Sequence, residues 1–318
     1  MATVFVSGTL PGDGVARLRS THDVVQHEDG VRSAAFAACR PQVEAVVALL
    51  TDRIDAAFLG GSPRLRVVAN VAVGVDNVDL VACSARGVIV TNTPDVLTEA
   101  TADLAFGLLL AAARRIAEGD RLVRGGGFTG WTPTFMLGNR VNGTTLGIVG
   151  MGSIGRAMAR RARGFGMNVL YTQRERLAVS VEAKLGATFV GALDDLLAAA
   201  ESVSIHCPLT PATRHLFDER RLARMRPGSI LVNTARGPIV DEAALAHALE
   251  HGPLAAAGLD VFEDEPRVHP ALLQRLNVVL APHIGSADRP TREAMAAMAV
   301  DNVLAVLTGR AALTPVAG

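Results

Sequence analysis

The chain has 318 residues, of which 49% are hydrophobic, and its 31 basic and 31 acidic residues give a formal net charge of zero. This length predicts two domains with sizeable cores, and the balanced charge excludes a bulk field that would attract nucleic acid or an acidic membrane. We therefore expect no nucleic-acid and no membrane partner.

Three cysteines, Cys39, Cys83 and Cys207, form no short-spaced pair. This pattern argues against a disulfide framework and against a zinc site, so we expect no metal. The first residues, 1–8, have neither a charged start nor a long apolar core, which predicts a strand rather than a signal peptide. A cytoplasmic location is the expectation.

The first region of the chain alternates short apolar segments with helix-prone ones, which predicts a small α/β unit. It contains no Gly-x-Gly-x-x-Gly motif and ends near residues 92–95. The expected strands and buried segments are residues 3–7, 43–50, 65–70 and 87–91, with a helix that begins near Val15.

A long helix is predicted over residues 98–123, because Thr98, Glu99 and Asp103 suit a helix N-terminus and Gly125 marks an end. Its apolar residues occupy most sides, so we expect burial between the domains. The nonhelical segment 128–140 follows, with the only tryptophan of the chain. This segment is either a subunit contact or a local satellite core.

A dinucleotide-binding motif follows the apolar strand 146–149 and precedes the helix-prone run 156–163. Within it, Gly150 allows a tight turn, Gly152 lets the backbone approach a pyrophosphate, and Gly155 lets the helix and strand pack closely. The N–H groups at the helix start, which include Ser153 and Ile154, face the anion. The arginines of this helix are expected to form a solvated face.

Further strands end in small or polar residues, as expected where the carboxyl ends of parallel strands line a ligand crevice. A final helix over residues 291–309 is predicted to pack on the first region, which makes that domain discontinuous. The predicted strands are residues 168–172, 187–190, 203–206, 230–233, 256–259 and 278–280.

The end of the second strand separates NAD from NADP, because an NAD site places a carboxylate there for the ribose 2′-hydroxyl. Here Gln173 is neutral, and Arg174, with Arg176 as a second candidate, could meet a 2′-phosphate. NADP(H) is therefore favoured. NAD(H) use stays open, since Glu175 could reach the ribose on a different loop path.

Three strand ends carry groups suited to reduction of a 2-oxo acid. Arg236 could hold the substrate carboxylate and polarise its carbonyl with a rigid fork. His283 could donate the proton as hydride arrives. Glu265 would orient His283 and keep it protonated. Each residue type alone is more often structural, but together, behind a dinucleotide motif, they predict a catalytic set.

Over nearly its whole length, the chain resembles the D-isomer-specific 2-hydroxyacid dehydrogenase family, and within it the glyoxylate/hydroxypyruvate reductases. The matching stretches are residues 70–77, 91–98, 150–155, 233–237, 258–266 and 281–286. The resemblance implies an α/β protein with a Rossmann dinucleotide-binding domain, residues 98–286, inserted in a flavodoxin-like substrate-binding domain, residues 1–97 plus 287–318. It also implies a homodimer, in which Trp131 and Phe135 are interface candidates.

The resemblance further implies roles for individual residues. Arg236, Glu265 and His283 would be catalytic, and the backbone N–H groups of Val73 and Gly74 would bind the substrate carboxylate. Leu50 and Thr101 would line the pocket. The implied cofactor contacts, besides the glycine motif and the Gln173–Arg174 pair, are Cys207, Pro208 and Thr213 on the adenosine side, Asp260 at the nicotinamide carboxamide, and Thr234, Ala235 and Gly285.

The predicted function is NAD(P)H-dependent reduction of a small 2-oxo acid, such as glyoxylate or hydroxypyruvate, to the D-2-hydroxy acid. Alternatives within the family are dehydrogenases of the phosphoglycerate, phenylpyruvate or phosphite type. Formate oxidation is disfavoured, because formate dehydrogenases carry Gln where this chain has Glu265. The alternative from another class is a non-catalytic nucleotide-sensing protein, similar to the C-terminal-binding corepressors, because a shared fold does not fix function.

Overall fold

The structure, a computed structural model, describes residues 1–316 and divides into two compact units. Unit 1 combines Met1–Leu97 with Ser286–Gly318, and unit 2 is Thr98–Gly285. The predicted boundaries lie after residues 97 and 286, and the last two residues of the predicted first domain, 317–318, are outside the described part.

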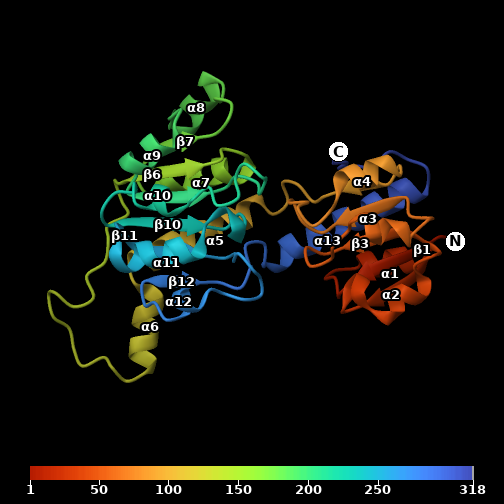
Figure 1. The fold of residues 1–318 in the computed structure, drawn as a ribbon, viewed down its shortest axis with the longest axis horizontal. Coiled ribbons are helices and arrows are strands. Elements are labelled where there is room, and N and C mark those ends of the chain that lie inside the picture. Colours follow the sequence, from red (N-terminus) through yellow and green to blue (C-terminus); the bar gives the residue numbers. More distant parts are fainter. Residues whose placement is uncertain (317–318) are drawn as a thin grey trace. The chain divides into compact units, whose positions relative to one another are not determined.

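Unit 1 is built on a five-stranded parallel sheet with the strand order β2-β1-β3-β4-β5 (Figure 1). This order, 2-1-3-4-5, is that of flavodoxin-like folds, as predicted. Its strands are β1 (Thr3–Ser7), β2 (Asp23–His27), β3 (Val43–Ala48), β4 (Val67–Asn70) and β5 (Ile89–Thr91). Its helices are α1 (Gly14–Arg19), η1 (Gly30–Arg32), α2 (Ala34–Cys39), α3 (Ala56–Gly60), α4 (Leu80–Ala85) and α13 (Arg289–Leu307).

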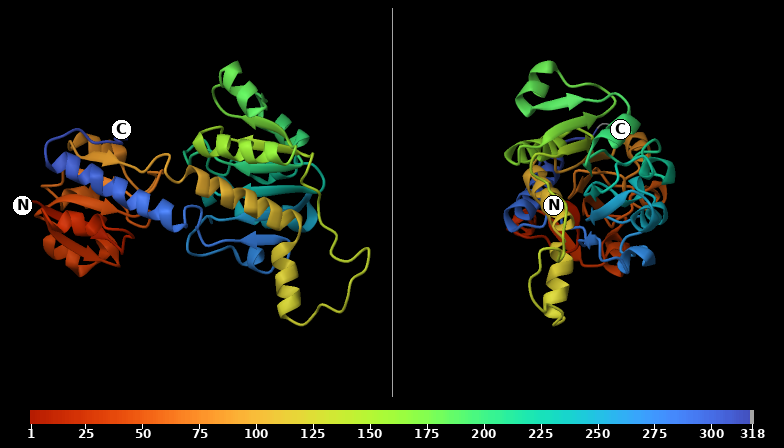
Figure 2. Two further views of the ribbon diagram at one scale, coloured as in Figure 1. Left: turned by 180° about the vertical axis from the view of Figure 1, so that it is seen from behind. Right: turned by 90° about the vertical axis from the view of Figure 1, so that its left-hand side faces the viewer.

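The last helix, α13, packs on β3, β4 and α1, so the C-terminal segment completes unit 1 (Figure 2). The return of this helix to the first region was predicted from the sequence. Strand β2 was missed, because its sequence, Asp23-Val-Val-Gln-His27, mixes polar and apolar residues at the sheet edge, where no side chain of the strand is fully buried.

Unit 2 is built on a seven-stranded parallel sheet with the order β12-β11-β10-β9-β6-β7-β8. Counted from β6, this is the 3-2-1-4-5-6 order of a Rossmann fold with one further strand. Its strands are β6 (Thr145–Val149), β7 (Asn168–Thr172), β8 (Ala187–Phe189), β9 (Ser202–Ile205), β10 (Ser229–Asn233), β11 (Leu254–Leu259) and β12 (Val278–Leu280). Its helices are α5 (Thr98–Ala113), α6 (Ile116–Arg124), α7 (Ser153–Gly164), α8 (Val179–Leu185), α9 (Leu193–Ala199), α10 (Glu219–Leu222), η2 (Gly237–Ile239), α11 (Glu242–His251) and α12 (Pro270–Leu273).

The single helix predicted over residues 98–123 is wrong: it is two helices, α5 and α6. The break lies at Arg115, whose φ of 55° is left-handed. The Arg115 guanidinium contacts both oxygens of Glu118, at 2.8 and 2.7 Å, in the first turn of α6. No glycine or proline marks this break, so a propensity argument could not locate it.

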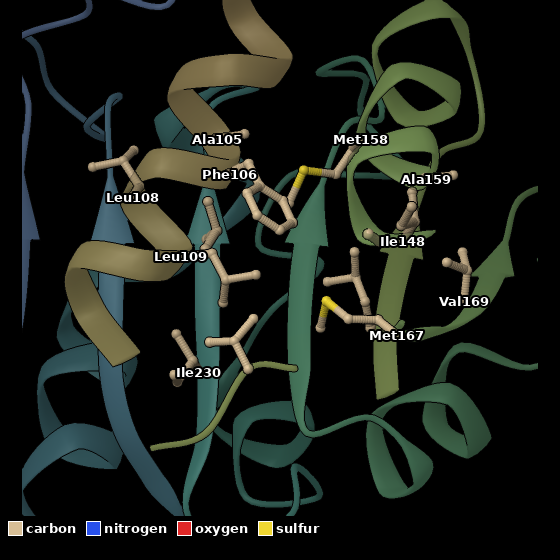
Figure 3. Close-up of a cluster of buried hydrophobic side chains, with 14 of the residues drawn as sticks. Ala105, Phe106, Leu108, Leu109, Ile148, Met158, Ala159, Met167, Val169 and Ile230 are labelled. Atoms are coloured by element: carbon tan, nitrogen blue, oxygen red, sulfur yellow. The ribbon is translucent and has the colours of Figure 1, made fainter. Parts of the chain in front are cut away.

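Helix α5 is buried within unit 2 by its own sheet. It packs on β10, β11, β12 and α7, and its side chains form a core with Ile148 of β6 and Met158 of α7 (Figure 3). A Cβ at Gly258 would lie 2.9 Å from Leu108 Cβ, so β11 needs a glycine where α5 crosses it. The apolar character of α5, from which we expected burial between the domains, is accounted for by this packing.

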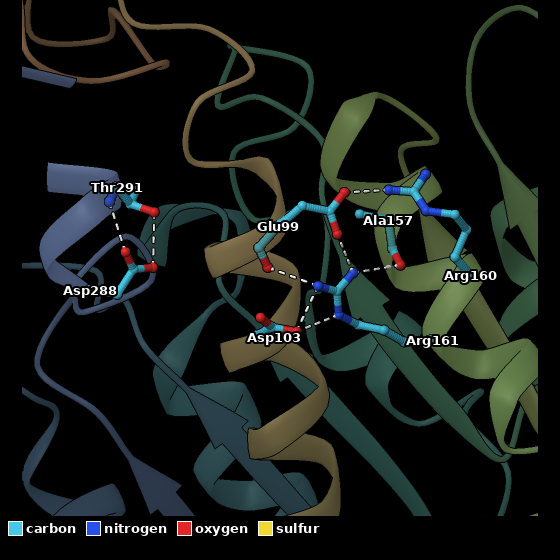
Figure 4. Close-up of polar contacts among 7 residues, drawn as sticks. All are labelled: Glu99, Asp103, Ala157, Arg160, Arg161, Asp288 and Thr291. Atoms are coloured by element: carbon cyan, nitrogen blue, oxygen red, sulfur yellow. Dashed lines mark hydrogen bonds and ion pairs between the residues drawn. The ribbon is translucent and has the colours of Figure 1, made fainter. Parts of the chain in front are cut away.

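Two arginines of α7 are ion-paired to α5 rather than simply solvated (Figure 4). Arg161 contacts Glu99 at 2.9 Å and Asp103 at 2.6 Å, and its side chain is only 19% exposed. Arg160 also pairs with Glu99. The cluster ties the first two turns of α5 to the helix that follows the glycine motif. Arg160 and Arg163 are exposed, as expected of a solvated face, whereas Arg161 is covered by the cluster.

Within residues 1–316, no helix is both long enough and apolar enough to cross a bilayer.

Candidate active site

The glycine motif forms the turn between β6 and α7, and two of its glycines are required by their own surroundings. Gly150 has a φ of 96°, and a Cβ there would lie 2.7 Å from the backbone nitrogen of Cys207. A Cβ at Gly155 would lie 2.2 Å from the carbonyl oxygen of Gly150. The first glycine thus allows the turn and the third allows close packing, as predicted.

Gly152 differs, because, apart from its two neighbours in the chain, no part of the described residues lies within 4 Å of the position that its Cβ would take. Gly152 is also the N-cap of α7, a 12-residue helix, and has no side chain that could occupy the first-turn N–H groups. A space lined by backbone at a positive helix end fits a pyrophosphate. The residues present therefore suit a dinucleotide, with Ser153, Ile154 and Gly155 in the first turn.

The turn after β7 is linked to this motif by Gln173. The Gln173 side chain accepts from the backbone N–H of Met151 at 3.0 Å and donates to the carbonyl of Glu175 at 2.6 Å. Arg174 and Glu175 are exposed. Arg174 and Glu175 therefore lie at the surface of this turn, and the side-chain amide of Gln173 holds the turn in place.

Arg176, the second arginine considered for a 2′-phosphate, is held elsewhere. Glu182 of α8 accepts from Arg176 at 2.9 and 2.8 Å and from the Tyr171 hydroxyl at 2.6 Å. The hydrogen bonds from Arg176 and Tyr171 lower the pKa of Glu182 to about 2. Arg176 therefore closes the turn onto α8, which corrects its assignment as a phosphate-reading candidate.

We expect the Glu182 network to stabilise the fold at neutral pH and to lose this effect in acid. Because the folded pKa of about 2 lies below the ordinary 4.5, the stability from ionised Glu182 is complete above about pH 4.5 and is lost as the pH falls toward 2. Urea midpoints of the wild type and Glu182→Gln should therefore converge as the pH is lowered. Glu175→Gln, on the exposed turn, is the control, and a gap that stays constant down to pH 3 would contradict the assignment.

The loop after β9 lies beside the glycine motif, since Cys207 approaches Gly150. Thr213 donates to the carbonyl of Pro208 at 2.7 Å, so these predicted adenosine-side residues lie on one loop. Burial raises the pKa of the Cys207 thiol to about 11, so this residue is a neutral thiol at neutral pH.

After β10, the side chain of Thr234 is 8% exposed, and its hydroxyl has no hydrogen-bond partner among residues 1–316. A buried hydroxyl left unpaired is costly, so this atom is suited to meet a ligand group. The neighbouring Ala235 N–H is already used, because it donates to Asn233 Oδ1 at 3.0 Å.

His283 and Glu265 are in direct contact, as the sequence predicted. Nδ1 of His283 lies 2.8 Å from Oε2 of Glu265, while Oε1 accepts from the N–H of Phe262 at 3.0 Å. Burial opposes ionisation of Glu265, but the hydrogen bond and charge of His283, the Phe262 N–H and the Arg236 charge lower its pKa. Glu265 is thus an ionised partner of Nδ1, and Nε2 is the ring nitrogen left to face a substrate.

The loop of His283 is braced by Asp260. The Asp260 carboxylate is 1% exposed and accepts from the N–H groups of Ile284 at 2.7 Å and Gly285 at 2.8 Å. Burial raises the pKa of Asp260, opposed by these two N–H groups. Thr101 lies close by, since a Cβ at Gly285 would be 3.4 Å from its methyl group. The implied contact of Asp260 with a carboxamide stays a prediction, but its bracing role was not foreseen.

Arg236 follows β10 on a loop that touches the Glu265 loop through backbone. Asn233 holds this loop by donating to the Arg236 carbonyl at 2.9 Å. A Cβ at Gly237 would lie 1.8 Å from the carbonyl carbon of Phe262. Only glycine at residue 237 therefore lets the two loops meet, which places the Arg236 and Glu265 segments side by side.

A second carboxylate, missed from the sequence, clamps the loop that carries Glu265. Glu242, only 5% exposed, accepts from the N–H of Glu263 at 2.8 Å and from the N–H of His269 at 3.1 Å. Glu263 in turn pairs with His215 on the loop after β9. The Asp241-Glu242 pair at a helix start has the ordinary appearance of an N-cap, so nothing in the sequence indicated this clamp.

The three remaining predicted residues lie in unit 1. Leu50 lines a cavity of about 450 Å³ together with Asp76 and Asn77. Val73 is exposed and Gly74 is half-buried on the loop after β4. Arg236, Glu265 and His283 all belong to unit 2, so the structure brings the catalytic set together within one unit and places the predicted carboxylate loop in the other.

Comparison with known proteins places these features in one family. The family model for the NAD-binding domain of D-isomer specific 2-hydroxyacid dehydrogenases matches residues 106–285. A glyoxylate reductase of Thermococcus litoralis is 44% identical over 313 residues, covering 96% of this chain and 94% of the relative.

Two solved structures are similar over almost the entire chain. A glyoxylate reductase from Paecilomyes thermophila has a TM-score of 0.89 at 33% identity, covering 99% of this chain and 98% of the other. An NADPH-dependent glyoxylate/hydroxypyruvate reductase from Sinorhizobium meliloti, in complex with NADP and malonate, has a TM-score of 0.86 at 37% identity, covering 99% of this chain and 97% of the other.

Proposed function

Because this chain belongs to the D-isomer specific 2-hydroxyacid dehydrogenases, oxidoreductases that use a nicotinamide dinucleotide, we propose that it reduces glyoxylate or hydroxypyruvate to the corresponding 2-hydroxy acid. The observation that carries the proposal is the 2.8 Å contact between His283 Nδ1 and an ionised Glu265, in the same unit as the glycine motif. Hydroxypyruvate gives the D-hydroxy acid, and glyoxylate gives achiral glycolate.

In the proposed mechanism, the bound nicotinamide supplies the hydride to the keto carbon. Glu265 holds Nδ1–H of His283, so Nε2 points its proton at the carbonyl oxygen and releases it as the oxygen becomes an alkoxide. Arg236 holds the substrate carboxylate and polarises the carbonyl. The products are the 2-hydroxy acid and the oxidised nicotinamide, and His283 regains its proton from water.

The test is oxidation of NADPH and NADH, followed by absorbance, with glyoxylate, hydroxypyruvate, pyruvate and phenylpyruvate in parallel. The proposal predicts fastest turnover with glyoxylate and hydroxypyruvate. Preference for phenylpyruvate would favour another dehydrogenase of the family. Binding of the cofactor without turnover of any acid would contradict the proposal and favour a nucleotide-sensing protein.

For the cofactor, we favour NADPH because the exposed cation Arg174 follows β7, where an NAD site has a carboxylate. Gln173 supports this turn through Met151 and Glu175. The neighbouring carboxylate of Glu175 is also exposed. If the protein uses NADH instead, Glu175 is the residue that would accept a hydrogen bond from the ribose 2′-hydroxyl.

We expect Arg174→Ala to lower kcat/KM for NADPH by about tenfold or more, since a charge-assisted hydrogen bond contributes roughly 1.5–3 kcal/mol. The value for NADH should change little, because NADH has no 2′-phosphate. Glu175→Ala is the matched variant on the same turn and should leave NADPH use intact. Equal losses with both cofactors in Arg174→Ala would argue against phosphate reading by this residue.

We also propose a homodimer, with a cytoplasmic location as a further prediction. The segment after α6 leaves the body of unit 2 (Figure 2), and Phe128, Trp131 and Leu137 on it are 53%, 78% and 67% exposed. These exposures do not support a satellite core. Apolar surface of this kind is typical of a subunit contact. Sedimentation equilibrium of the wild type and Trp131→Ala would reveal a dimer that this contact stabilises.

A further inference from the structure

The loop after β4 is held through its carbonyl groups. Three successive carbonyl oxygens each accept one hydrogen bond at 2.9 Å from elsewhere in unit 1. The pairs are Thr93 N–H to Ala72 O, Asn92 Nδ2 to Val73 O, and Asn70 Nδ2 to Gly74 O. The orientation of three consecutive peptide planes is therefore set by donors outside the loop.

The same contacts orient the N–H groups of Val73, Gly74 and Val75. A trans peptide is planar, with its C=O and N–H pointing in opposite directions, and the one cis bond in the described residues is elsewhere. Each of these N–H groups therefore points away from the donor that holds the preceding carbonyl. None has an acceptor within residues 1–316. Backbone N–H groups that have no acceptor in the protein are strong donors, so these three groups on one loop are available to an anionic ligand.

Both asparagine donors are themselves fixed. Asn70 is fully buried and exchanges hydrogen bonds with Asn77 at 3.1 and 3.2 Å. The backbone of Asn92 is held by Thr314, whose hydroxyl donates to the Asn92 carbonyl at 2.6 Å. Thr314 is in turn bound by Asn302, a fully buried residue of α13. The C-terminal segment thus positions Asn92, and Asn92 positions the loop.

We propose that Asn92 and Asn70 are positioning residues for substrate recognition. By holding the carbonyls of Val73 and Gly74, they present the N–H groups of Val73, Gly74 and Val75 to the carboxylate of the 2-oxo acid. The inference rests on the proposed function and adds to it residues that do not touch the substrate. Preorganised N–H donors bind an anion more tightly than mobile ones, so the effect falls on substrate affinity and on selectivity for the charged carboxylate.

The test is Asn92→Asp, in which a carboxylate that cannot donate replaces the amide that holds Val73 O. We expect the KM for glyoxylate to rise by about tenfold, as for loss of a hydrogen-bonded anion site, while kcat changes by less than about threefold. The Kd of NADPH should stay the same. A merely structural defect would alter all of these values together.

The matched control is Asn142→Asp in unit 2, because the Asn142 amide also donates to a backbone carbonyl, that of Phe165, at 2.8 Å. Asn92→Ala, which removes the donor without adding charge, is the second variant if Asn92→Asp melts early by circular dichroism. An unchanged glyoxylate KM in a folded Asn92 variant would overturn the inference while the proposed function stands.

Titration with oxamate, an analogue of a 2-oxo acid that is not reduced by hydride transfer, gives a second readout that does not depend on turnover. We expect Asn92→Asp to weaken oxamate binding by a similar factor. If the wild type reduces no 2-oxo acid, the proposed function fails. An oxamate Kd that is the same in wild type and variant would then overturn this inference as well.

Discussion

Replacement of His283 by asparagine is expected to lower kcat for reduction by about 10²–10⁴-fold, the usual contribution of a positioned general acid. Asparagine is the preferred substitution because His283 has a φ of 54°, and asparagine tolerates this left-handed conformation better than alanine does. The braces from Asp260 to Ile284 and Gly285 remain, so the loop should keep its path. NADPH binding, measured by fluorescence titration, should be unchanged.

His251→Asn, at an exposed histidine of α11, is the control for this substitution. Glu265→Gln gives a companion measurement, because it keeps a side chain of the same size beside Nδ1 and removes the carboxylate that contacts this nitrogen at 2.8 Å. We expect kcat for reduction to fall in Glu265→Gln while the Kd of NADPH stays the same, since the ring loses the ionic partner that orients it. Near-normal turnover in His283→Asn would contradict the assignment of the proton donor.

Replacement of Arg236 by glutamine is expected to lower kcat/KM by about 10²–10³-fold, since it removes a charged donor from both the carboxylate and the developing alkoxide. Arg236→Lys should restore little, because a lysine keeps the charge but not the planar fork. The kinetics with glyoxylate and the Kd of NADPH together separate this effect from loss of cofactor binding, and the Kd should not change.

The control for Arg236 is Arg226→Gln, an exposed arginine just before β10. Full activity of Arg236→Lys would show that a positive charge alone is sufficient and that the bidentate contact of the guanidinium is not needed. A KM that stays at the wild-type value in Arg236→Gln would exclude a carboxylate contact for this residue.

Local chemistry made the glycine motif and the contact between His283 and Glu265 predictable. Gly155 is needed because the start of α7 packs on the carbonyl of Gly150, and Gly150 is needed for the turn, so the spacing of the two glycines in the sequence predicts both. The approach of Cys207 to Gly150 is a second requirement, and it comes from a distant segment. Arg236, Glu265 and His283 each follow a strand of a parallel sheet, and the carboxyl ends of neighbouring strands meet at one edge. The positions of Arg236, Glu265 and His283 after successive strands therefore predict that their side chains lie at the same edge of the sheet.

Residues that act through others were not predictable in this way. Asn92 hydrogen-bonds Val73 across 19 positions, and Glu242 holds Glu263 across 21. An asparagine in a loop and a glutamate at a helix start occur in many folds, and their partners are backbone groups that have no side-chain signature. The pairing of Arg176 with Glu182 was not predictable for the same reason, because it forms only when α8 packs beside the end of β7.

The sequence by itself determined the two α/β units, the dinucleotide turn and the contact between His283 and Glu265, because these depend on strand periodicity, glycine spacing and the positions of side chains at strand ends. The tertiary structure alone decided that the predicted long helix breaks at Arg115, which arginine after β7 pairs with Glu182, and how the peptide planes of residues 72–75 are oriented. These features depend on the direction of individual hydrogen bonds between segments far apart in the chain, and that direction exists only after the sheets have formed.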